Sequence, residues 1–243
     1  MSGIRRRDLL TGTAALWVSG KAVPGEVVPG RLPWHPGSAA APAPLKQGPW
    51  AFFTDPEAAT VGAIANRIIP PDPTTPGGQD AGCVVFIDRQ LAGPYGQHLG
   101  LYVAGPFNKG SKQQGPQSAQ TPREMYRKGI EALDRYSRSA GGGKPFAQLE
   151  ADRQDELLHG LESSTLELEG VDGQTFFEQL LKDIQQGFFA DPIYGGNQDM
   201  CAWKMIGFPG ARYDYTDWVS RHNERYPHPP VSIAGRPDWN PGR

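Results

Sequence analysis

Repeated capping boxes constrain the fold of this chain more than any other feature. In a capping box, a Thr at the helix N-cap is followed three residues later by Glu, directly before an apolar stripe at helical spacing. The pattern occurs at Thr54, Thr121 and Thr175, and nowhere do apolar and polar residues alternate as in a strand. The sequence therefore predicts an all-α fold with about five amphipathic helices. The predicted helices cover residues 54–69, 81–91, 121–140, 149–161 and 175–188.

Glycine and proline are frequent for a helical protein, with 31 glycines and 24 prolines among 243 residues. This composition predicts long irregular segments between the helices, of which residues 93–120 are one. The C-terminal residues form another, an extended tail rich in aromatic side chains. Such side chains are typical of docking surfaces, or they pack back on the chain's own helices. The aromatic residues of the tail are Tyr213, Tyr215, Trp218, Tyr226 and Trp239.

The N-terminus has the pattern of an export signal. Arg6 and Arg7 are followed by one residue and then by Leu9 and Leu10, as in a twin-arginine signal. The mildly apolar stretch that follows is too short to span a membrane. The alternative is a basic N-terminus followed by an unrelated apolar stretch. Because the twin-arginine translocase carries folded proteins, the signal predicts export of a folded chain.

A composition change divides the chain into two parts. Prolines recur from residue 20 to residue 50, as in a linker that cannot bury enough surface to order itself. We therefore predict a twin-arginine signal and Pro/Ala/Gly-rich linker over residues 1–45 and a single helical domain over residues 46–243. No second apolar stretch is long enough for a transmembrane helix.

The charge of the chain argues against nucleic acid as a partner. Residues 1–45 carry five basic and two acidic side chains, a balance of +3, whereas the whole chain carries −2, so the remainder carries −5. A mildly acidic domain lacks the excess of positive charge that attracts nucleic acid or an anionic lipid surface.

Patterns typical of catalysis or cofactor binding are missing from the sequence. None of the five histidines is spaced for a metal site, and neither a nucleophile elbow nor a phosphate-binding glycine loop occurs. The pair Gly195-Gly196 fits a tight turn better than an anion site. We therefore expect no catalytic residue, no cofactor-binding residue and no metal ligand on this chain.

The chain has two cysteines, Cys83 and Cys201. In an oxidising compartment two cysteines most simply form a disulfide, which here would close a loop of more than 100 residues. The alternative is a pair of small buried hydrophobic side chains. We predict the disulfide.

Four stretches of the sequence resemble the gluconate 2-dehydrogenase subunit 3 family. The most specific are residues 187–197 (GFFADPIYGGN) and residues 203–211 (WKMIGFPGA). Residues 86–96 and the helix end at residues 67–70 are also similar to this family. The resemblance extends over roughly residues 50–240, and the twin-arginine leader agrees with it.

This resemblance implies a complex with three kinds of subunit. A large subunit would bind FAD and oxidise a sugar or sugar acid, most simply D-gluconate to 2-dehydro-D-gluconate. A cytochrome c subunit with several haems would pass electrons to quinone and anchor the complex at the periplasmic face of the cytoplasmic membrane. The small subunit would carry no cofactor and would support folding, export and activity of the large one. The alternative function is a stand-alone periplasmic carbohydrate-binding module.

Large side chains in irregular backbone are the candidates for a partner interface. Interface energy concentrates in a few buried aromatic groups, so these side chains could anchor a partner. They could equally fix their own segment on the helices. The aromatic candidates are Tyr194, Trp203, Phe208 and Trp218, and Asn197 of the same segment is a further candidate.

Overall fold

The computed structural model describes residues 48–99, 105–108, 110–111, 119–212, 215–227 and 229–233. Within these residues the chain is helical, and its only strand-like pairing is two isolated bridges. The all-α fold class is therefore confirmed. Five of the α-helices are the predicted ones, and the short α7 is absent from the prediction. The α-helices are α2 (Asp55–Ile68), α3 (Cys83–Ala92), α4 (Pro122–Ala140), α5 (Ala151–Glu162), α6 (Gly173–Phe189) and α7 (Cys201–Ile206).

Two of the three predicted capping boxes are present. Thr54 and Thr121 are N-caps, and in each box the Glu three residues on accepts the N–H of the Thr. At α6 the prediction was two residues late. Asp172 is the N-cap there, and its carboxylate accepts bonds from the backbone N–H (3.0 Å) and the hydroxyl (2.9 Å) of Thr175. Because Asp caps a helix at least as well as Thr, α6 begins at Gly173.

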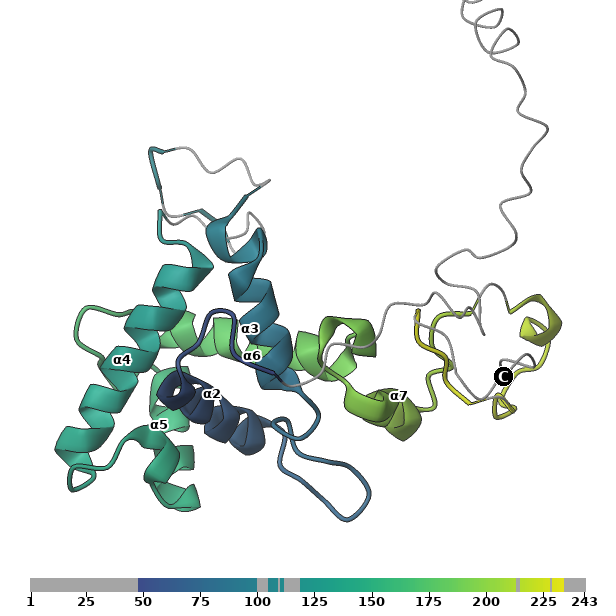
Figure 1. The fold of residues 1–243 in the computed structure, drawn as a ribbon, viewed down its shortest axis with the longest axis horizontal. Coiled ribbons are helices and arrows are strands. Elements are labelled where there is room, and N and C mark those ends of the chain that lie inside the picture. The colour runs from purple at the N-terminus through teal and green to yellow at the C-terminus, as the bar shows by residue number, and fades with distance from the viewer. Residues whose placement is uncertain are drawn as a thin grey trace, which may run out of the picture.

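Helix α6 lies at the centre of the bundle and packs against α2, α3, α4, α5 and α7. Phe176, Leu180 and Ile184 on its apolar face have no exposed surface. Figure 1 shows α2 to α6 gathered in one bundle, with α7 and the C-terminal residues to one side of it. The short helix α7 therefore lies at an end of the bundle, next to irregular chain.

A buried carboxylate on α4 joins three parts of the bundle. Asp134 is 7% exposed and accepts the backbone N–H of Phe146 (3.0 Å) and the hydroxyl of Thr60 (3.3 Å). Phe146 begins a short 3₁₀ turn, η3 (Phe146–Gln148), and is itself fully buried. Asp134 thereby holds the connection between α4 and α5 against α2.

A second buried carboxylate lies on α6. Asp183 is 3% exposed and accepts hydrogen bonds from the hydroxyls of Tyr126 (2.8 Å) and Tyr95 (3.1 Å) and from the amide of Gln179 (2.8 Å). Tyr95 belongs to the short turn η1 (Tyr95–Gln97), so the carboxylate joins this turn to α4 and α6. Burial raises the pKa of Asp183, and its three donors act in the opposite direction.

Replacing Tyr126 by Phe should destabilise the protein in a pH-dependent way. The variant removes one donor to the buried carboxylate, which costs about 2 kcal/mol of unfolding free energy. The pKa of Asp183 then rises further. Between the unfolded and folded pKa values the folded state binds more protons, so stability falls as pH rises through that window. The loss relative to wild type should therefore be larger at about pH 7 than at about pH 4. Urea unfolding at both pH values measures this loss of unfolding free energy. An equal loss at both pH values would contradict the claim that the Tyr126 hydroxyl stabilises the charged form of Asp183.

Candidate functional site

The signature segment, residues 191–210, is held together by Asn197. This side chain is fully buried. Its Nδ2 donates to the carbonyl oxygen of Ala190 (2.9 Å), and its Oδ1 accepts the N–H of Ala202 (2.9 Å). Asn197 thereby joins the end of α6 to the first turn of α7. It offers no surface to a partner, so the predicted interface role is wrong for this residue.

Trp203 also lies inside the segment rather than on its surface. It is 6% exposed, and its Nε1 donates to the carbonyl oxygen of Phe189 (2.9 Å). The ring of Phe208 packs against it edge-on, with the centroids 5.2 Å apart. Trp203 therefore fixes α7 to the end of α6, which is the alternative role that the sequence analysis gives to these side chains. Phe208 lies over Trp203 and is 43% exposed.

Glycine lets the signature segment lie directly on the bundle. A Cβ atom at Gly196 would lie 2.0 Å from the carbonyl oxygen of Gly187 on α6. Nearby, the N–H of Gln198 donates to the carbonyl oxygen of Ala81, just before α3 (2.9 Å). Backbone approach this close requires a residue without a side chain. The glycine pair therefore serves packing.

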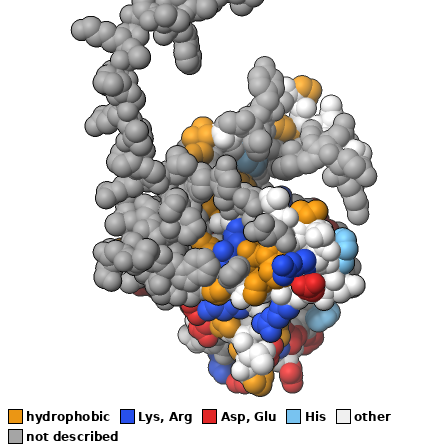
Figure 2. Space-filling view, turned by 90° about the vertical axis from the view of Figure 1, so that its right-hand side faces the viewer, with side chains coloured by type: hydrophobic (Ala, Val, Ile, Leu, Met, Phe, Trp, Pro, Cys, Tyr) orange, Lys and Arg blue, Asp and Glu red, His pale blue; other side chains and the backbone are white. Residues whose placement is uncertain are grey.

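The outer side of this region exposes large apolar side chains. Nine large hydrophobic residues are exposed in the described part of the chain, and five of them fall between residues 189 and 208. Figure 2 views this end of the molecule and shows hydrophobic side chains beside lysine and arginine side chains. Large apolar side chains exposed this close together in the sequence are candidates for a protein-binding site. The five residues, here called the apolar surface, are Phe189, Tyr194, Met205, Ile206 and Phe208.

Two candidate interface residues belong to the apolar surface, and three of its members were not predicted. Tyr194 and Phe208 are 46% and 43% exposed. Met205 and Ile206 could have been recognised only by predicting α7, whereas Phe189 is the last residue of α6. On a helix, Met205 lies two positions beyond the buried Trp203 and therefore points away from the face that Trp203 buries.

The C-terminal arm, here the described residues 211–212, 215–227 and 229–233, returns to the bundle. Asp191, at the end of α6, accepts the hydroxyl of Ser232 (2.6 Å) and the N–H of Ile233 (2.7 Å). Within the arm, Trp218 packs edge-on against Tyr226 (5.3 Å), and the guanidinium of Arg221 lies 4.5 Å from the Trp218 ring. The half-buried Trp218 thus belongs to an aromatic cluster of the arm itself.

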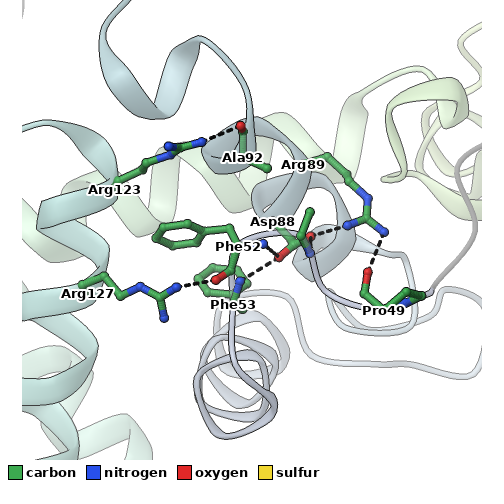
Figure 3. Close-up of polar contacts among 9 residues, drawn as sticks. Pro49, Phe52, Phe53, Asp88, Arg89, Ala92, Arg123 and Arg127 are labelled. Carbon is green, nitrogen blue, oxygen red and sulfur yellow. Dashed lines mark hydrogen bonds and ion pairs between the residues drawn. The ribbon is translucent and has the colours of Figure 1, made fainter.

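Buried Asp88 on α3 holds the start of the described chain (Figure 3). It accepts the backbone N–H groups of residues 51–53, each at 2.9 Å. Arg89 bridges Asp88 (2.6 Å) to the carbonyl oxygen of Pro49 (3.1 Å). Arg127 on α4 donates to the carbonyl oxygen of Phe52 and stacks 4.2 Å from its ring. The chain that follows the predicted linker is therefore fixed to two helices.

The predicted export signal, with Arg6, Arg7, Leu9 and Leu10, lies outside the described residues, as does the rest of residues 1–47.

The predicted disulfide is not formed. Cys83 and Cys201 are free thiols, the first buried and the second half-buried. Each has its own acceptor, because Cys83 donates to the carbonyl oxygen of Ile184 (3.5 Å) and Cys201 to Oδ1 of Asn197 (3.8 Å). Burial raises the pKa of the Cys83 thiol to about 12, so this thiol stays protonated near neutral pH. The prediction rested on compartment chemistry and carried no information about distance.

The described residues contain neither a grouped set of metal ligands nor a helix suited to cross a membrane. Within them, no three His, Cys, Asp or Glu side chains are grouped closely enough to hold a metal ion. None of the helices described is both long and apolar enough to cross a membrane. The arrangement suits binding of another protein through the apolar surface.

Comparison with known proteins gives one finding. The family model described as gluconate 2-dehydrogenase subunit 3 matches residues 55–210, which include α2 to α7 and the whole signature segment. Neither the curated proteins nor the solved structures contain a match to the chain. Since the family model covers more than half of the sequence, the chain belongs to the gluconate 2-dehydrogenase subunit 3 family.

Proposed function

We propose that this chain is the small, non-catalytic subunit of a flavoprotein dehydrogenase complex on the periplasmic face of the cytoplasmic membrane. In this proposal the large subunit binds FAD and oxidises a sugar acid, with D-gluconate as the first substrate to test. A cytochrome c subunit with several haems accepts the electrons. The small subunit carries no cofactor and supports folding, export and activity of the large one. Membership of the family supports a dehydrogenase subunit of this kind.

The apolar surface is the observation that carries this proposal. Asn197 and Trp203 hold the backbone of the signature segment from within, yet Met205 and Ile206 beside them are 51% and 57% exposed. Exposed side chains on a fixed backbone suit docking, because little conformational entropy is lost on binding. Tyr194, Phe208 and Trp218 remain candidate contacts with the partner.

Replacing Ile206 by Asp should weaken binding of the large subunit without destabilising the small one. A charge placed in an apolar interface is desolvated without a partner, so the dissociation constant should rise about tenfold or more. Leu99→Asp is the matched control, since Leu99 is 61% exposed and lies outside the apolar surface. Both variants should keep the wild-type melting temperature.

Copurification of the co-expressed subunits, followed by titration of the purified pair, measures the effect. A yellow, haem-containing complex that loses the Ile206→Asp chain but keeps the Leu99→Asp chain supports the proposal. Equal binding by both variants would place the docking surface elsewhere. A colourless monomer that binds sugar would contradict the proposal and support a carbohydrate-binding module.

Export through the twin-arginine translocase is tested by replacing Arg6 and Arg7 together with Lys. The change keeps both positive charges but removes the guanidinium groups. A loss of export would therefore show that the translocase recognises the guanidinium groups and not the charge alone. The chain should remain in the cytoplasm, and the large subunit with it. Arg5→Lys is the matched control and should be exported normally. Periplasmic recovery of the double variant at the wild-type level would show that this pair is not the signal.

A further inference from the structure

A cavity lies where residues 1–47 join the domain. Its volume is about 350 Å³, and it lies between α2, the start of α3 and Gln198 of the signature segment. Trp50, the third described residue of the chain, forms part of its wall. Because three separate parts of the chain line this cavity, it exists only after the domain has folded.

The lining of the cavity combines apolar side chains with two carboxylates. Ala58, Val84 and Val85 are buried, whereas Asp55 and Asp80 are exposed. Among the described lining residues there is no Lys, Arg or His. No ion pair within the described part of the chain includes either carboxylate. The cavity therefore suits a ligand that combines an apolar group with a positive charge.

The chain that leads to this cavity has that composition. Residues 27–47 contain Arg31 and Lys46 and no Asp or Glu. Leu45 directly precedes Lys46, so an apolar side chain and an ammonium group are adjacent. Two prolines at positions 42 and 44 fix φ just before them, which lowers the conformational entropy that this stretch loses on binding. Its charge is complementary to that of the cavity.

The position of the chain at the cavity brings Lys46 within reach. Arg89 donates to the carbonyl oxygen of Pro49 (3.1 Å), so the backbone is fixed directly before Trp50 (Figure 3). Lys46 is three residues before Pro49, so their Cα atoms are at most about 11 Å apart. The backbone also bends at Pro49. Only a short stretch of chain has to close on the cavity, so the entropic cost of closure is small.

We propose that residues 44–47 of this chain (PLKQ) bind in the cavity, with Leu45 against its apolar lining and the Lys46 ammonium beside Asp55 and Asp80. The proposal concerns this chain alone and does not depend on the proposed function. Since the cavity forms only in the folded domain, the end of the linker is bound to the domain only after folding. A segment of the large subunit is the competing occupant and is an outcome of the test.

Limited digestion of the full chain with trypsin, before export, measures this contact. Trypsin cleaves after Lys46 when the segment leaves the cavity, so the cleavage rate follows the population of the unbound segment. In Asp55→Asn/Asp80→Asn, cleavage after Lys46 should be about fivefold faster than in wild type at low salt. The difference should shrink at high salt. Cleavage after Arg31, outside the bound segment, should keep its wild-type rate.

Glu167→Gln/Glu178→Gln is the matched control. It also removes two carboxylates, and both residues are exposed and lie outside the lining of the cavity. This variant should be cleaved after Lys46 at the wild-type rate. Equal cleavage rates in the wild type and in both variants would overturn the proposal.

Photo-crosslinking locates the segment without any change of charge, so it also decides the matter if the Asp55→Asn/Asp80→Asn chain melts early. A photo-reactive amino acid is placed at Leu45 of the full chain, or at Leu32 as the control, and the products are mapped by mass spectrometry. Cross-links from Leu45, and none from Leu32, to the cavity lining on α2 and α3 are the expected result. Cross-links from Leu45 only to other parts of the domain, or only to the co-expressed large subunit, would overturn the proposal.

Discussion

Buried aspartates that accept hydrogen bonds from distant parts of the chain hold this structure together. Asp88 fixes the first described residues to α3, and Asp134 fixes the connection between α4 and α5. Asp183 joins the turn after α3 to α4 and α6, and Asp191 fixes the C-terminal arm to the end of α6. A carboxylate offers several acceptor sites, so one side chain can satisfy two or three N–H or O–H groups of irregular backbone. A chain rich in glycine and proline is ordered here by these few contacts, in addition to its apolar core.

These long-range hydrogen bonds to buried aspartates explain why the sequence predicts the helices better than their connections. Capping residues and apolar stripes are local signals, and they locate five of the helices within a few residues. The partners of Asp88 are 35 to 37 residues away in sequence, and those of Asp134 are 12 and 74 residues away, so no local pattern reveals them. Aspartate is also usually exposed, which makes a buried one look like surface in a sequence. The start of α6 was missed for a different reason, since Asp172, three residues before Thr175, is a second local N-cap candidate and is the one that caps the helix.

Some residues of the signature segment pack inside it and others are exposed on its surface, and the residue types alone do not show which is which. Asn197 and Trp203 are buried and hold the backbone, whereas Tyr194 and Phe208 are exposed. In the sequence all four lie in a stretch without helical periodicity, which gives no sign of which way each side chain faces. Only the position of α7 shows which ones face inward, and a six-residue helix gives a weak periodic signal. The segment is thus a fixed platform, whose interior is satisfied by its own chain and whose outer side suits a partner.

Hydrogen–deuterium exchange on the isolated subunit tests most directly whether this platform exists before a partner binds. The N–H of Ala202 donates to Asn197 and the N–H of Gln198 donates to the carbonyl oxygen of Ala81, both at 2.9 Å. These two amides should exchange slowly in the subunit alone and change little when the large subunit is added. Rapid exchange in the isolated subunit, with protection only in the complex, would show that the segment folds on binding and would contradict a preformed docking platform.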